Sequence, residues 1–181
     1  MFKKILAAIV VVVAGFAGYV ALQPDVLNVE RQATIAAPPA AVFAQLNDLH
    51  KWESWSPWAK LDPNAKISFE GPAAGKDAVF IWSGNEKIGE GRMTIVDSRP
   101  DEYVDIMVAF TKPFEDTSSS TFELKPQAGK TLVTWRMRGE QNFLQKAFCV
   151  LMNGEEMLGG EMEKGLANLQ AVAEAGATPT P

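Results

Sequence analysis

The chain has 181 residues, of which 47% are hydrophobic, and a core of this size folds without needing a metal or a disulfide. Its formal net charge is −5, and the part that follows Lys3 and Lys4 holds 15 basic against 22 acidic residues, which argues against nucleic acid and against a polybasic membrane-binding surface. A single cysteine, Cys149, excludes an intramolecular disulfide, and a single histidine, His50, argues against a zinc site.

The amino terminus predicts a membrane-spanning helix. Residues 5–22 form an unbroken apolar run that would be roughly 27 Å long as a helix, close to the hydrocarbon thickness of a bilayer. Lys3 and Lys4 favour a cytoplasmic amino terminus, so the rest of the chain would lie outside the inner or plasma membrane, which is the periplasm if the cell is Gram-negative. A cleaved signal peptide is the alternative, although no clear cleavage site of small residues precedes residue 23.

These observations divide the chain into three parts. Residues 1–24 are the anchor or signal peptide, residues 27–174 a globular domain, and residues 175–181 a tail expected to be disordered.

The domain begins with a strand and two short helical segments. Residues 27–37 alternate as a strand does, Pro38 and Pro39 stop them, and residues 40–46 form a short helix. Three of the five tryptophans follow within residues 49–58, where Pro57 limits the segment to a short helix and a turn. These tryptophans either plug the side of the core or line a pocket, with their N–H groups as polar handles.

Six further strands are predicted, at residues 66–70, 77–83, 88–98, 102–111, 114–125 and 130–139, and their short spacing indicates an antiparallel meander. Alternation places apolar side chains on one face, which should contact the last helix: Met93, Ile95, Phe122, Leu124, Val133, Trp135 and Met137. The other face mixes both charges, as cross-strand pairs on a solvated face do: Glu90, Arg92, Glu123, Arg136 and Arg138.

The carboxy-terminal part predicts an apolar helix over residues 143–152 and, after Asn153 and Gly154, a long helix over residues 155–173. An apolar stripe at spacings of three and four runs along the long helix: Leu158, Met162, Leu166, Leu169 and Val172. Its three glycines, at positions 159, 160 and 165, each lower helix stability by roughly 1 kcal/mol relative to alanine. They indicate either close packing on the sheet or a helix that roofs a cavity.

Signals for chemistry are weak. The glycine-rich stretches 71–75 and 84–91 do not open a helix after a strand, which argues against a nucleotide site. His50 is more typical of a surface residue than of a catalytic base. Glu161, next to the apolar stripe, is a weak candidate for a general acid or base, and a solvated helix face explains it more simply.

The order of elements resembles the START-like, SRPBCC superfamily, the helix-grip fold that polyketide cyclase/dehydrase-like proteins share. Local sequence agrees at residues 35–43, 47–58, 89–95 and 165–169, and the resemblance covers about residues 28–173. It implies an α+β fold in which a curved antiparallel sheet wraps around the long C-terminal helix, with an apolar cavity between them. No cofactor is expected.

Large or soft side chains are expected to line that cavity and bind ligand: Trp55, Trp58, Trp82, Met93, Met107, Phe110, Phe122, Trp135, Met157 and Met162. The favoured function is membrane-anchored binding of a hydrophobic small molecule, such as a lipid or an aromatic, polyketide-like compound. A cyclase- or dehydratase-like enzyme that uses one carboxylate is the first alternative. A protein-interaction module that presents the tryptophan-rich segment is the second.

Overall fold

A seven-stranded antiparallel sheet is the framework of the domain, in the order β1-β7-β6-β5-β4-β3-β2. The structure, a computed structural model, describes residues 2–177. The strands are β1 (Val26–Ile35), β2 (Lys66–Glu70), β3 (Val79–Ser83), β4 (Glu90–Arg99), β5 (Tyr103–Lys112), β6 (Asp116–Gln127) and β7 (Lys130–Glu140). Every predicted strand is present, and the antiparallel meander is confirmed, with β1 added at its β7 edge.

Within the described residues, five helical segments accompany the sheet: α1 (Phe2–Ala21), α2 (Pro39–Leu46), the 3-10 helix η1 (Leu49–Ser54), α3 (Phe143–Met152) and α4 (Gly154–Ala177). The Asn142 side chain accepts a hydrogen bond from the Gln145 N–H at the start of α3, and Asn153, at φ 51°, ends this helix in the left-handed region. Because α4 continues to Ala177, the first three residues of the expected tail are helical, and residues 178–181 lie outside the described part of the chain.

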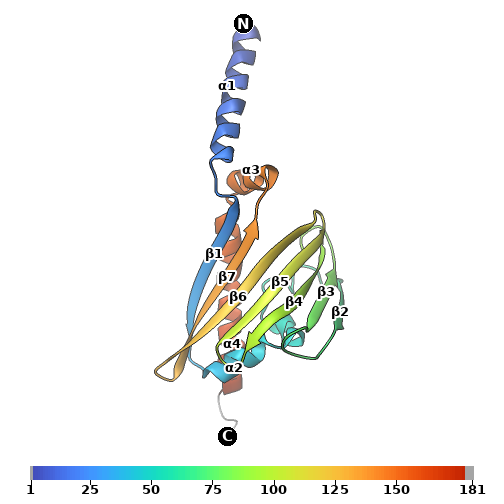
Figure 1. Cartoon of the computed structure of the whole chain (residues 1–181), viewed down its shortest axis with the longest axis vertical. Helices are drawn as coiled ribbons and strands as arrows, with labels where there is room; N and C mark the ends of the chain where they lie inside the picture. The colour runs from blue at the N-terminus through green and yellow to red at the C-terminus, as the bar shows by residue number, and fades with distance from the viewer. Residues whose placement is uncertain (1, 178–181) are drawn as a thin grey trace.

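Helix α1 projects away from the domain, so the start of α1 and the end of α4 lie at opposite ends of the molecule (Figure 1). Its side chains are mostly exposed, and only its last turns contact α3, where Val20 is fully buried. Within residues 2–177 it is the one helix that is long and apolar enough to cross a bilayer.

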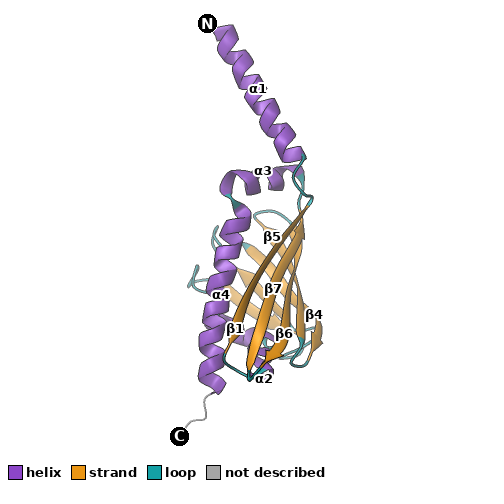
Figure 2. Ribbon diagram, turned by 90° about the vertical axis from the view of Figure 1, so that its left-hand side faces the viewer, coloured by secondary structure: helices purple, strands orange, loops and turns teal. Residues whose placement is uncertain are grey.

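Helix α4 lies along the concave side of the sheet, next to β1 (Figure 2). The stripe residues Met162, Leu166 and Leu169 are at most 2% exposed, so this part of the predicted stripe is the buried face of the helix. The helix-grip arrangement, a curved sheet holding the long C-terminal helix, is therefore confirmed.

Two of the helix's three glycines mark points of close approach. A Cβ atom on Gly165 would lie 2.8 Å from the Trp135 ring and 3.0 Å from Cδ of Pro57, and one on Gly159 would collide with the Arg31 guanidinium. At Gly160 the same atom would meet nothing within 4 Å. Close packing on the sheet therefore explains Gly159 and Gly165.

The convex face of the sheet carries the predicted charge pairs. Arg136 on β7 lies opposite Glu30 on β1 in the register, and its guanidinium donates to the Glu30 carboxylate over 2.6 and 3.0 Å. These hydrogen bonds lower the pKa of the Glu30 carboxyl below its usual value. Lys112 and Glu90 form a similar pair across 3.1 Å. Exposed pairs of this kind stabilise a fold only weakly, by about 0–1 kcal/mol each.

The glycine contacts predict opposite effects for one substitution at two sites. Gly165→Ala should lower the free energy of unfolding by up to about 2 kcal/mol, because overpacking against Trp135 and Pro57 outweighs the roughly 1 kcal/mol gained in helix propensity. Gly160→Ala, in open space, should raise it by up to about 1 kcal/mol. Urea unfolding of the full chain in detergent measures both changes, and equal effects at the two positions would contradict the packing described.

Candidate functional site

A cavity of about 200 Å³ lies on the concave face of the sheet, beside the tryptophan-rich segment. Strands β3, β4 and β5 supply most of its sheet wall: Phe80, Trp82, Met93, Val108 and Phe110. The segment around η1 and the loop after it supplies the opposite wall: Trp52, Ser56, Trp58, Ala59 and Ala65. Trp135 and Met137 on β7 close a third side.

The cavity occupies the end of the sheet that carries α1 and α3. In the register, Trp82 lies opposite Ile67 on β2 and opposite Gly91 on β4, and Gly91 lies opposite Phe110. This row lies toward the end where β1 begins and β7 finishes, the end from which α1 projects (Figure 1). Toward the other end, Ile95 and Ile106 are fully buried in the core. The concave face is thus solid at one end and hollow at the other.

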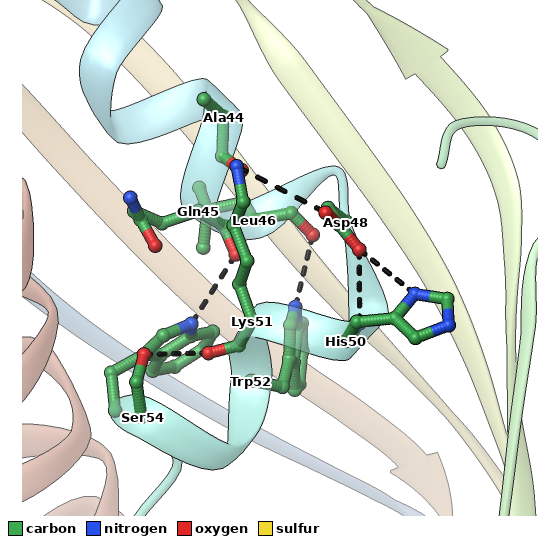
Figure 3. A network of polar contacts seen from close by, with 9 residues as sticks. Ala44, Gln45, Leu46, Asp48, His50, Lys51, Trp52 and Ser54 are labelled. Atoms are coloured by element: carbon green, nitrogen blue, oxygen red, sulfur yellow. Dashed lines mark hydrogen bonds and ion pairs between the residues drawn. The ribbon is translucent and has the colours of Figure 1, made fainter. Parts of the chain in front are cut away.

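Hydrogen bonds to the preceding helix hold the tryptophan-rich segment in place (Figure 3). The indole N–H of Trp52 donates to the carbonyl of Leu46 over 3.0 Å, and that of Trp55 donates to the carbonyl of Gln45 over 3.3 Å. At the start of η1, Asp48 accepts a hydrogen bond from the His50 N–H. Both indoles are nearly buried, at 3% and 1% exposed, so this segment forms a wall of the domain.

Three of the four tryptophans in the lining have a paired indole N–H, and that of Trp52 has been described above. The indole N–H of Trp82 donates to the Ile88 carbonyl over 2.9 Å, and that of Trp135 donates to the Ser120 hydroxyl over 2.8 Å. Trp58 is the exception among the lining tryptophans, because its N–H makes no hydrogen bond within residues 2–177. A ligand in the cavity therefore meets mainly aromatic and aliphatic surface, and the uncharged side-chain donors of the lining without a hydrogen bond in residues 2–177 are the Trp58 N–H and the Ser56 hydroxyl.

The charged side chains that line the cavity are exposed to solvent. Glu53 and Lys87 are its two ionisable lining residues, and both are exposed. Burial, followed by the nearby Asp97 carboxylate, raises the pKa of the Asp105 carboxyl. Asp105 alternates with the inward-facing Val104 and Ile106, however, and so points to the convex side. Within the described residues, the cavity lining contains no buried carboxyl.

The expected ligand-binding residues separate into two groups. Five line the cavity: Trp58, Trp82, Met93, Phe110 and Trp135. The other five do not: Trp55, Phe122 and Met162 are in the solid core at no more than 1% exposed, while Met107 and Met157 are 39% and 57% exposed. Alternation along β5 already indicated that Met107 points outward. The same alternation along β3 could have identified Phe80, which is on the same face as Trp82.

The expected position of the cavity, between the sheet and the C-terminal helix, is corrected by the structure. No residue of α4 lines the cavity, because Gly159 and Gly165 let this helix pack directly on β1 and Trp135. Glu161 is on the surface of α4, where its side chain is 33% exposed and pairs with Lys164 over 2.7 Å. It therefore does not supply the buried carboxylate that an acid–base role in the cavity requires.

A family model described as "Polyketide cyclase / dehydrase and lipid transport" matches residues 26–174. Among curated proteins, none matches the chain.

Solved structures share the fold at low identity. The di-domain ARO/CYC protein StfQ of the steffimycin biosynthetic pathway superposes with a TM-score of 0.62 at 13% identity, covering 84% of this chain and 52% of that one. A Rhizobium loti protein matches with 0.55 at 23% identity, over 79% of this chain and 96% of that one. The Aha1 dimer of Colwellia psychrerythraea matches with 0.55 at 16% identity, over 84% and 99% respectively.

Proposed function

Because the chain belongs to the polyketide cyclase/dehydrase and lipid-transport family, we propose that it binds a hydrophobic small molecule in the cavity beside the tryptophan-rich segment. One observation carries this proposal: an apolar space of about 200 Å³ is bordered by large apolar side chains, and three of its four tryptophans have their indole N–H satisfied within the protein. The family and the fold support binding of a hydrophobic ligand. We infer the class of ligand from the size and the chemistry of the cavity.

The volume limits the ligand. Pockets for drug-sized molecules measure about 300–1,000 Å³, whereas an engineered apolar cavity of about 150 Å³ accepts benzene. A space of about 200 Å³ thus suits a compact aromatic compound, or one ring or chain end of a larger lipid whose remainder extends past Glu53 and Lys87 into solvent. The buried part of the ligand is uncharged, because the only ionisable lining residues, Glu53 and Lys87, are exposed and leave the buried lining without a charged partner.

Binding is favoured over catalysis and over a protein-interaction module. A general acid or base must reach the reacting atoms. The buried part of the lining offers no such group, because its ionisable residues, Glu53 and Lys87, are both exposed to solvent. An interaction module would present the tryptophan-rich segment outward, whereas the Trp52 and Trp55 indoles are buried.

We further propose that α1 remains attached and anchors the domain on the outer side of the inner membrane. The helix has 20 residues, and Lys3 and Lys4 stand at its amino end. Tethering keeps the cavity close to ligands dissolved in the bilayer and raises their effective concentration. The chain would then act as a membrane-bound carrier or sensor of such a compound.

Filling the cavity should weaken binding of an apolar ligand. Met93→Trp places a larger side chain in the lining. The affinity of this variant for ethylnaphthalene should fall by at least about tenfold, which is about 1.4 kcal/mol. Met107→Trp is the matched control, because Met107 is on the neighbouring strand and faces outward. Calorimetric titration of the full chain in amphipol, against an amphipol blank, measures both affinities. If Met107→Trp lost affinity for ethylnaphthalene while Met93→Trp kept it, the site assignment would be contradicted.

The unpaired Trp58 N–H predicts a preference for ligands with one hydrogen-bond acceptor. Trp58→Phe should weaken binding of acetylnaphthalene by about 0.5–1.5 kcal/mol while leaving ethylnaphthalene, of similar shape, nearly unchanged. The same titration measures the difference between the two ligands. Equal losses for both would show that the ring, and not its N–H, is what the ligand contacts.

A further inference from the structure

The outward side of α3 presents large apolar side chains that no element of the described chain covers. Leu144, Phe148 and Leu151 are spaced by four and three residues, so they lie on one face of the helix, and they are 64–71% exposed. Phe143 and Met152 flank them at 52% and 49% exposed. We call these five residues the α3 face. An apolar surface of this kind usually marks an interaction site.

The opposite side of α3 is fixed to the residues that follow α1. Lys146 is the only charged residue of the helix and is 6% exposed. Its ammonium group donates to the Gln23 carbonyl over 3.1 Å and to the Asp25 carboxylate over 2.8 Å. This charge-assisted contact lowers the pKa of the Asp25 carboxyl. The helix therefore has one polar side held against the protein and one uncharged side turned outward.

The position of α3 relative to α1 indicates what covers the α3 face. Helix α3 runs across the end of α1 (Figure 2) and contacts its last turns, where Phe16 and Ala17 are half-buried and Val20 is fully buried. If α1 spans a bilayer, its last turns lie where the helix leaves the hydrocarbon. The α3 face is then continuous with the apolar surface of α1 at the boundary between acyl chains and headgroups.

We infer that α3 lies in the surface of the same bilayer that α1 crosses, with the α3 face inserted at the acyl–headgroup boundary; this rests on the proposed anchor. Helices of this type insert their apolar side by roughly 5–10 Å. The inserted side carries no charge, so apolar burial and not attraction to anionic lipid drives the contact. The occupant is therefore a lipid surface of any headgroup charge.

This contact would orient the ligand cavity. One flexible tether leaves a domain free to rotate, whereas a second contact beside it fixes which end of the domain faces the membrane. The hollow end of the sheet is the end that carries α1 and α3, so docking of the α3 face holds the cavity on the membrane side. An apolar ligand would then have a short path between bilayer and cavity.

Site-specific quenching in vesicles tests the inference on the full chain. In a Cys149→Ala background, a single cysteine is introduced by Leu151→Cys, Val12→Cys or Ala171→Cys and labelled with the fluorophore NBD. Val12 reports on α1, and Ala171, exposed near the far end of α4, is the matched control outside the membrane. Each protein is reconstituted in phosphatidylcholine vesicles with increasing doxyl-labelled lipid, and separately titrated with aqueous iodide.

We expect doxyl lipid to quench the NBD emission at positions 12 and 151, and iodide to quench it at position 171. Raising the salt concentration should leave the quenching at position 151 unchanged. Quenching by doxyl lipid at position 12 and by iodide at position 151 would overturn the inference and leave the anchor standing. Protection of position 151 from both quenchers would mean that a second copy of the chain covers the α3 face, and would also overturn it. Iodide quenching at both positions 12 and 151 would remove the anchor and the inference with it.

Discussion

The packing of Trp135 divides the concave face of the sheet into a filled half and a hollow half. Its ring stacks on Phe122 at a centroid distance of 4.9 Å and lies against Gly165 of α4 on the filled side. Toward the cavity it meets the Trp58 ring edge-on at 5.9 Å, and its N–H is held by Ser120. Since the indole is 1% exposed and contacts both halves, it forms the wall between the core and the cavity.

A glycine is what allows this division. With a side chain at position 165, α4 would stand further from the sheet, and the space beneath it would have to be filled or left empty. Glycine instead brings the helix onto the indole and leaves the hollow part of the face to η1 and the loop that follows it. Glycine at this position lowers helix propensity, but it allows a core that is tightly packed under α4 and open beside it.

Much of the fold could be predicted from the sequence, because strand alternation and the long helical stripe are local patterns. Five of the residues that line the cavity were expected there because their side chains are large or soft. The position of the cavity could not be obtained in this way, since it depends on how closely α4 approaches the sheet. The glycines of α4 were compatible with either close packing or a vacancy, and only the contacts of Gly159 and Gly165 decide between them. Trp55 and Met162 were expected in the cavity for their size, yet size alone does not separate a lining residue from a core residue.

An apolar ligand in the hollow half of the domain is the proposal on which the functional assignment depends. Native mass spectrometry of the full chain, released from a mild detergent, tests it most directly, because a bound compound appears as added mass on the 19.7 kDa protein. We expect a co-purifying uncharged, apolar small molecule that is present on the natural chain and on Met107→Trp, and absent from Met93→Trp. A bare chain in every preparation, including after incubation with excess ethylnaphthalene, would contradict it.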